Sequence, residues 1–308
     1  MTKLLCFDMD KYSETSTVER NQSMYQDFAI DMITTDDGSA LQNLAQSVGW
    51  NFTTGQTNLF ISPTGRMFGY RFEGNLVTSA GIYIYDSALA SLGVVIVHSD
   101  FQRKGLGKSI VKHCLIEAER VGAPVMLVAT AQGFPLYESL GFQAIGNIHR
   151  FEVSEPVEDI RINESFQVDH VDEGDLGQLI ELDETVIGAN RSRLYPVLFS
   201  NMECGYVVRN SQNTVIGFSF AVRRNNVLVV GPIVADSHNV ALMLIKNFVS
   251  GWSGSVRIDV PSQQEKFMKD LLTYGFEEKM VSPIMILNAQ ELGGKRDQLY
   301  GIADPVFG

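Results

Sequence analysis

The sequence has few cysteines and no long apolar run, and both absences exclude classes of protein. Its 308 residues contain three cysteines, Cys6, Cys114 and Cys204, which lack the close paired spacing of zinc sites and redox dithiols. No stretch approaches the roughly 20 apolar residues of a membrane helix, and the apolar run 4–7 is too short for a signal peptide. We therefore expect a reduced, cytoplasmic protein that has no metal site and does not enter a membrane.

Positive charge is also scarce. The chain has 24 Lys and Arg against 36 Asp and Glu, which gives a formal net charge of -12. Such a charge repels nucleic-acid phosphates and anionic lipids and attracts cationic small molecules, so we expect neither nucleic acid nor a membrane as a partner. Hydrophobic residues make up 45% of the sequence, and the chain is long enough for two cores, which predicts two globular domains.

The predicted elements occur in the same order twice. A continuous apolar strand at 92–97 precedes a strongly amphipathic helix at 105–121, and a second series of strands and helices begins after the polar, proline-containing stretch 153–165. The segment 137–142, Tyr-Glu-Ser-Leu-Gly-Phe, corresponds to 271–276, Leu-Leu-Thr-Tyr-Gly-Phe. This repetition predicts two related α/β domains at residues 27–155 and 165–290, with an N-terminal arm at 1–26 and a C-terminal tail at 291–308.

A glycine-containing loop lies between the predicted strand and its helix. Residues 102–107 read Gln-Arg-Lys-Gly-Leu-Gly. Glycines let successive backbone N–H groups point to one place at the positive end of a helix dipole, which can bind a pyrophosphate without a metal. Arg103, Lys104 and Lys108 add positive charge. An ordinary strand-to-helix turn with solvated basic residues is the alternative for such a glycine pair on its own.

In this context the sequence resembles the GNAT superfamily of N-acetyltransferases, in particular a bacterial group of tandem members whose second domain is degenerate. The loop has the family form Gln/Arg-x-x-Gly-x-Gly/Ala, and residues 136–142 match a second family element, Leu-Tyr-Glu-x-x-Gly-Phe. Further similarity at 49–53 and 127–137 extends the resemblance over nearly the whole chain. It implies acetyl-CoA as co-substrate and two domains in tandem, each with a mixed, largely antiparallel central sheet flanked by helices.

The resemblance also assigns residues to the cofactor site. The backbone of the splayed fourth strand, Val95, Ile96 and Val97, would bind the pantetheine arm. Thr130 stands where relatives often carry an asparagine that contacts the cofactor. Tyr137 matches the family's general acid, a phenol that can protonate the departing thiolate. The loop would bind the pyrophosphate through Gln102, Arg103, Lys104, Gly105, Leu106, Gly107 and Lys108. Plain core packing is the alternative for the strand residues and for Tyr137.

The acceptor side is less well defined by the sequence. Trp50 and Asn51 lie in the loop that lines the acceptor side in relatives, although Trp50 could equally be a core residue. Asp259 interrupts a buried strand near its carboxyl end, where α/β folds place ligand contacts, and an ion pair with Arg257 is the alternative. Ser91 stands near the position where several relatives carry a glutamate that could act as the general base. The general base is therefore open, with the candidates Glu73, Asp86 and His98.

The second domain lacks the features of a cofactor site. Its counterpart of the loop, 235–241, has no glycine, it places Asp236 at the mouth of the loop, and Leu271 replaces Tyr137. We therefore expect this domain to bind no acetyl-CoA and to cover the acceptor side of the first domain, which would form a closed, acidic pocket. The sequence predicts acetyl-CoA-dependent N-acetylation of a primary amine of a small molecule, by direct attack in a ternary complex. A non-catalytic acyl-CoA-binding regulator and a protein or peptide N-acetyltransferase are the alternatives.

Overall fold

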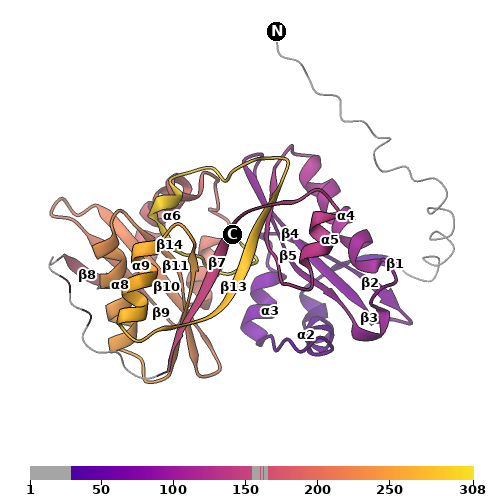
Figure 1. Cartoon of the computed structure of the whole chain (residues 1–308), viewed down its shortest axis with the longest axis horizontal. Helices are drawn as coiled ribbons and strands as arrows, with labels where there is room; N and C mark the ends of the chain where they lie inside the picture. Colours follow the sequence, from indigo (N-terminus) through magenta and orange to yellow (C-terminus); the bar gives the residue numbers. More distant parts are fainter. Residues whose placement is uncertain (1–28, 155–159, 161, 163–165) are drawn as a thin grey trace, which may run out of the picture.

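The structure is a computed structural model, and it describes residues 29–154, 160, 162 and 166–308. The predicted arm at 1–26 and most of the predicted linker lie outside these residues. The strands form one continuous 14-stranded sheet that extends through both halves of the molecule (Figure 1). Helices cover both faces of this sheet, which confirms the predicted mixed α/β class.

The first half contains the strand and the helix that flank the glycine-containing loop. The apolar run predicted as a strand at 92–97 lies in β5, and the predicted helix at 105–121 is α4. The elements are β1 (Ala29–Ile33), the 3-10 helix η2 (Thr35–Asp37), α2 (Gly38–Gln46), α3 (Thr54–Phe60), β2 (Arg66–Phe72), β3 (Asn75–Leu76), β4 (Thr78–Tyr85), β5 (Leu89–Val97), η3 (Ser99–Phe101), α4 (Leu106–Glu119), β6 (Val125–Val128), α5 (Phe134–Glu138) and β7 (Gln143–Val153).

The second half repeats this order and then adds a short strand in the tail, residues 291–308. Its elements are β8 (Gln167–His170), η4 (Glu173–Asp175), α6 (Leu176–Ile187), α7 (Tyr195–Asn201), β9 (Cys204–Arg209), β10 (Val215–Arg224), β11 (Val227–Ala235), α8 (His238–Ser250), β12 (Ser255–Pro261), α9 (Glu265–Thr273), β13 (Glu277–Leu287), η5 (Arg296–Gln298) and β14 (Leu299–Gly301).

The two halves exchange their last long strands at the centre of the sheet. The strand order is β1-β2-β4-β5-β6-β13-β7-β12-β11-β10-β9-β8. Strand β13 of the second half therefore pairs with β6 of the first, and β7 of the first half pairs with β12 of the second. Figure 1 shows β7 and β13 side by side between the halves. Each half thus completes the sheet of the other.

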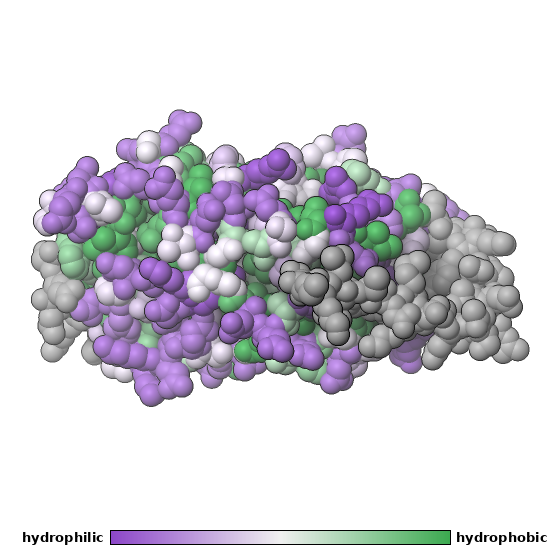
Figure 2. Space-filling model, turned by 90° about the horizontal axis from the view of Figure 1, so that it is seen from above, coloured by the Kyte–Doolittle hydropathy of each residue, from purple (hydrophilic) through white to green (hydrophobic). Residues whose placement is uncertain are grey.

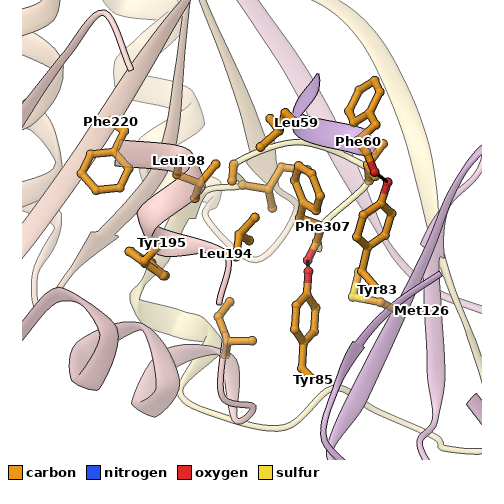
Figure 3. Close-up of a cluster of buried hydrophobic side chains, with 14 of the residues drawn as sticks. Leu59, Phe60, Tyr83, Tyr85, Met126, Leu194, Tyr195, Leu198, Phe220 and Phe307 are labelled. Atoms are coloured by element: carbon orange, nitrogen blue, oxygen red, sulfur yellow. Dashed lines mark hydrogen bonds between the residues drawn. The ribbon is translucent and has the colours of Figure 1, made fainter. Parts of the chain in front are cut away.

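The face of the first half's sheet opposite α4 is covered by both halves and by the tail. One core on this face joins Leu59 and Phe60 of α3 with Leu198 of α7 and Phe307 of the tail. Figure 3 shows Phe307 near Tyr83, Tyr85 and Phe60. Residues distant in sequence, from both halves and from the tail, therefore meet on this face.

The face of the molecule in Figure 2 is mainly hydrophilic. Hydrophilic residues cover most of its area, with hydrophobic residues between them. Within the part of the chain that the structure describes, no helix is both long and apolar enough to cross a membrane.

Candidate functional site

Strands β5 and β6 diverge and leave an opening at their carboxyl ends. Their parallel register holds two residue pairs, Ala90 with Val125 and Ser91 with Met126, although β5 continues to Val97. Strand β6 instead continues its pairing with β13 on its other side. The residues 95–97 that were expected to bind the pantetheine arm therefore border this opening.

A bulge changes the direction of the β5 backbone at the opening. Val94 has a positive φ of 53°, and the register with β4 shifts between Ser79 and Gly81. The Ser79 hydroxyl donates a 2.8 Å hydrogen bond to the Val94 carbonyl, which satisfies this buried oxygen. Val95 and Val97 are partly exposed whereas Ile96 is buried. The pairing with β4 resumes beyond the bulge at Ser79 and Ile96, so the free edge of β5 at this point is the one toward β6, where a ligand's polar groups could bind.

The loop before α4 leaves backbone donors without partners inside the helix. The N-cap is Gly105, with φ of 83° and no side-chain cap. The bond from Ser109 N–H to the Gly105 carbonyl closes the first turn, so the N–H groups of Leu106, Gly107 and Lys108 have no intrahelical acceptor. Such a helix start binds anions. A Cβ at Gly107 would lie 3.3 Å from Cγ2 of Val97, so the helix begins close against β5.

The other loop residues divide into buried and exposed ones. The Gln102 side chain donates a 3.2 Å hydrogen bond to the Val97 carbonyl and joins the loop to β5. Arg103, Lys104 and Lys108 are exposed, and the Lys104 ammonium lies 4.8 Å from the centre of the Phe101 ring. The Leu106 side chain is buried in the core, so this residue can offer a ligand only its backbone. The loop therefore combines free backbone donors with positive charge.

Tyr137 lies on α5 and is 8% exposed. Its ring packs 5.8 Å from that of Phe142, and a Cβ at Gly133 would lie 3.0 Å from its Cε2 atom. Burial raises the pKa of the Tyr137 phenol, so the group keeps its proton at physiological pH. The Thr130 hydroxyl accepts a 3.0 Å hydrogen bond from the Gly133 N–H and thereby shapes the start of α5. The structure thus gives Thr130 a contact within the turn that precedes α5.

Ser91 has a structural contact of its own. Its side chain is fully buried, and its hydroxyl donates a 2.7 Å hydrogen bond to the Val306 carbonyl of the tail. Gly93, on the same strand, also contacts Val306, since a Cβ there would lie 3.0 Å from the Val306 Cα. Ser91 therefore joins β5 to the tail.

A pocket of about 540 Å³ opens between the halves on the face opposite α4. It is bordered by β6 through Met126 and Val128, by β7, by the loop after β12, and by the tail through Arg296 and Gly308. Neither Trp50 nor Asn51 is among its lining residues; both are exposed, and the Trp50 ring packs 5.8 Å from that of Phe52. The pocket lining is largely apolar and carries charges of both signs.

Asp259 is engaged in ion pairs rather than free for a ligand. Its carboxylate is 3% exposed and accepts hydrogen bonds from Arg257 Nε at 3.1 Å and from Arg150 Nε at 3.2 Å. Burial alone would raise the pKa of Asp259, but the two arginines lower it. The ion pair considered from the sequence is therefore present, and we do not include Asp259 in the candidate site.

The corresponding opening in the second half is filled by the chain itself. Ser79 faces Ile96 beside the bulge of the first half, and Ser219 faces Ile233 beside a similar bulge in the second. Strand β14 pairs with Ile233 and Val234, the counterparts of Ile96 and Val97. The Ile302 N–H also donates a 3.0 Å hydrogen bond to the Asp259 carbonyl, which connects the tail to β12.

The start of the second half's helix α8 is also satisfied internally. Its N-cap is Ser237, whose side chain accepts a hydrogen bond from the Val240 N–H, whereas α4 has no side-chain cap. Among the described residues, no cluster of His, Cys, Asp and Glu could hold a metal ion. Within the described residues, therefore, only the first half combines the opening, the uncapped helix start and the buried phenol.

Comparison with known proteins gives the family. Two family models, both described as acetyltransferase (GNAT) domain, match residues 63–144 and 179–301. The chain is 32% identical over 254 residues to the uncharacterized N-acetyltransferase YitH of Bacillus subtilis (strain 168). This alignment covers 80% of this chain and 87% of YitH. The chain belongs to the GNAT acetyltransferase family. The family and the tandem arrangement predicted from the sequence are therefore confirmed.

Solved structures show the same GNAT fold at lower identity. A candidate acetyltransferase of Pyrococcus horikoshii has a TM-score of 0.78 at 20% identity, and the match covers 92% of this chain and 96% of that one. A tandem GNAT protein from the clavulanic acid biosynthesis pathway has a TM-score of 0.62 at 12% identity, covering 84% and 98%. These likenesses support the fold of two GNAT units in one chain.

Sequence reasoning missed the contribution of the tail. Residues 299–308 are almost entirely buried, and Phe307 is fully buried. Arg191 of the second half is buried as well, and its Nη1 donates to the carbonyls of Phe307 at 3.2 Å and Gly308 at 2.6 Å. The available signal was the aromatic and apolar content of Val306 and Phe307, which is unusual for a free terminus.

Proposed function

We propose that the first half binds acetyl-CoA and transfers its acetyl group to a primary amine of a small molecule. The observation that carries this proposal is the opening between β5 and β6, with the uncapped start of α4 at its end. The family membership of the chain supports the reaction type.

The residues of the first half suit each demand of the reaction. The N–H groups of Leu106, Gly107 and Lys108 would hold the pyrophosphate, and the edge of β5 at Val95–Val97 would hold the pantetheine arm. A neutral amine then attacks the thioester carbonyl, its nitrogen releases one proton to solvent water, and the tetrahedral intermediate collapses with loss of the thiolate. Tyr137, which burial keeps protonated, would donate its proton to the departing sulfur.

The second half supports the proposal as a structural partner. Strand β14 fills its opening, and Ser237 satisfies the start of its helix, so we expect one acetyl-CoA per chain. The pocket between the halves measures about 540 Å³. This volume lies within the roughly 300–1,000 Å³ of small-molecule sites, and it favours a small amine over a protein acceptor.

Two measurements on the full chain test the proposal. Calorimetry should detect acetyl-CoA binding, and release of free CoA with a panel of primary amines should detect transfer. Failure to bind acetyl-CoA would overturn the proposal. Tight binding without CoA release for any amine in a broad panel would favour the non-catalytic regulator instead.

A further inference from the structure

Arg296 is an arginine at the pocket without a carboxylate partner. It lies in η5, lines the pocket and is partly buried. Its Nε donates to the Gly293 carbonyl at 3.0 Å and its Nη2 to the Ile187 carbonyl at 2.9 Å. Within the described residues, Nη1 makes no hydrogen bond and no carboxylate lies within 4.0 Å of the guanidinium. One edge of this cation therefore lacks a protein partner.

The other arginines with little exposure are neutralised. Each of four arginines whose side chains are 0–15% exposed pairs with an aspartate, namely Arg191 with Asp183, Arg209 with Asp175, Arg224 with Asp304 and Arg257 with Asp259. Removing a charge from water is costly unless it is paired. Arg296 departs from this rule at the wall of a pocket, which is where a ligand could supply the missing anion.

The electrostatic environment of Arg296 favours an anion. Burial, together with the nearby Arg191 guanidinium, lowers the pKa of Arg296 to about 10, and the Asp183 carboxylate offsets this only in part. The charged form is thus less favourable than in water, although it persists at neutral pH. An anion bound at Nη1 would relieve this penalty, because it would stabilise the charged form.

The rest of the pocket suits an amino acid better than a phosphorylated ligand. Ser262, Gln263 and Gln290 offer neutral hydrogen-bonding groups, whereas Glu291 and Asp297 bring negative charge to the lining. A single guanidinium beside two carboxylates would repel a dianionic phosphate, but it fits a carboxylate through the planar fork of arginine. The carboxylates suit the ammonium end of the same ligand.

We propose that the acceptor is an amino acid, a molecule that carries both a primary amine and a carboxylate, and that Arg296 binds its carboxylate. This inference rests on the proposed acetyl transfer and adds the substrate class. Binding the carboxylate at Arg296 orients the acceptor within the pocket. Arg296 is thus a specificity-determining residue that contacts the substrate and takes no part in proton transfer.

Matched pairs of acceptors test the inference. Each pair consists of an L-amino acid and the amine that its decarboxylation gives, and kcat/KM is measured for both members with the full chain. The best amino acid should exceed its amine by about 10-fold or more, the range expected for a charge-assisted hydrogen bond. Arg296→Gln should abolish this preference by raising KM for the amino acid, with the KM for acetyl-CoA unchanged.

Two further variants separate the role of Arg296 from general effects of charge and folding. Lys295→Gln removes the same charge one residue away, at an exposed side chain outside the pocket lining, and should keep the preference. Arg296→Lys keeps the charge and should retain part of the preference. If Arg296→Gln unfolds, as monitored by circular dichroism, Arg296→Lys decides: a partial loss of the preference in that folded variant supports recognition by the Arg296 guanidinium, and an unchanged preference overturns it.

The outcomes separate failure of the inference from failure of the proposed function. Equal kcat/KM for amino acids and their decarboxylated amines in the wild type would overturn the inference while leaving acetyl transfer intact. Failure of acetyl-CoA to bind would overturn the proposed function. If acetyl-CoA binds without turnover, calorimetry with N-acetylglycine decides: binding in the wild type that Arg296→Gln loses supports the carboxylate site, and equal affinities overturn it.

Discussion

At the scale of single residues, Tyr137 shows how burial keeps a phenol protonated. Its phenol is 8% exposed, and burial in the core beneath α4 raises its pKa. Burial disfavours the charged phenolate, so the phenol keeps its proton at neutral pH and is present as the protonated form when the thiolate departs. The same burial explains why the sequence left packing open as an alternative. Acid catalysis and core packing would both place the Tyr137 side chain in the same buried environment.

Tyr137→Phe distinguishes these two roles. We expect the variant to keep its affinity for acetyl-CoA and to lose turnover by about 10²-fold or more, because it retains the ring but not the acid. Steady-state kinetics with an identified acceptor, combined with calorimetry, measures both quantities. Turnover equal to the wild type at every pH would restrict Tyr137 to packing.

Tyr83→Phe is the matched control for losing a buried phenol. The Tyr83 hydroxyl donates a 2.8 Å hydrogen bond to the Phe60 carbonyl (Figure 3). Its loss leaves that buried carbonyl unsatisfied and should lower the free energy of unfolding by about 1–2 kcal/mol. Turnover at a temperature where the variant is folded should stay near that of the wild type.

Gly105→Glu tests the proposed pyrophosphate site at the start of α4. The substitution brings a like charge to the expected pyrophosphate, at a residue whose φ of 83° strains any side chain. We expect acetyl-CoA binding to be lost in calorimetry. Gly122→Glu is the control, because Gly122 follows the other end of the same helix, has a φ of 70°, and points into open space. Gly122→Glu should lower the free energy of unfolding by a similar amount and leave acetyl-CoA binding intact. Equal losses of binding in the two variants would exclude a specific pyrophosphate site at the start of α4.

At the scale of elements, a continuous apolar run marked β5 and an amphipathic pattern marked α4, and both elements lie within a few residues of their predicted positions. The short helices α3 and α7 were not predicted. Each has seven residues, too few for an apolar stripe to be recognised. Their signals were local: Thr53 and Gln56 form a capping box before α3, and Pro196 stands at the start of α7. Tertiary packing stabilises both helices at the contact between the halves.

The Asp259 ion pairs join β12 of the second half to β7 of the first. Asp259→Asn leaves Arg257 and Arg150 without their anion and should lower the free energy of unfolding by about 3–5 kcal/mol at neutral pH. The folded-state pKa of Asp259 is lowered, so its contribution is present above the unfolded value near 3.8 and is lost as pH falls through the folded pKa. The difference between the proteins should therefore shrink below about pH 4.

Urea unfolding of both proteins between pH 7 and pH 3 measures this difference. Glu277→Gln serves as the control, because Glu277 pairs with Lys279 at the exposed end of β13. We expect no measurable change from that variant, since solvent and salt screen the pair. A constant gap between the wild type and Asp259→Asn down to pH 3 would show that the carboxylate's charge is not what stabilises the strands.

At the scale of the whole molecule, the pairing of the central strands could not be predicted from local patterns. Strands β7 and β13 each have 11 residues and stand in equivalent places in the two halves. Either could pair within its own half by its sequence, so the exchange depends on long-range packing. The predicted domain boundaries at 155 and 165 fall on residues outside those the structure describes. The site loop and Tyr137 were predictable because their motifs are local, whereas the tail and Arg296 reach the pocket only through the tertiary fold.

Residues 1–155 expressed alone should fail to form the site. The fragment lacks β13, which pairs with β6 along Val125–Val128, and it lacks the tail residues that contact Ser91 and Gly93. Circular dichroism should show a loss of cooperative unfolding, and calorimetry should show no acetyl-CoA binding. Adding residues 166–308 as a separate chain should restore both if the exchanged strands are the cause. A cooperatively folded, fully active fragment would contradict this dependence.

The complete chain should bind one equivalent of acetyl-CoA. In the first half β5 and β6 diverge and α4 begins without a side-chain cap, whereas in the second half β14 pairs with Ile233 and Val234 and Ser237 caps α8. A second acetyl-CoA would have to displace β14 and break its hydrogen bonds. Calorimetric titration measures the stoichiometry, and Gly105→Glu assigns the site, because it should reduce one equivalent to none. Two equivalents in the wild type, or one remaining in Gly105→Glu, would show that the second half binds the cofactor despite its filled opening.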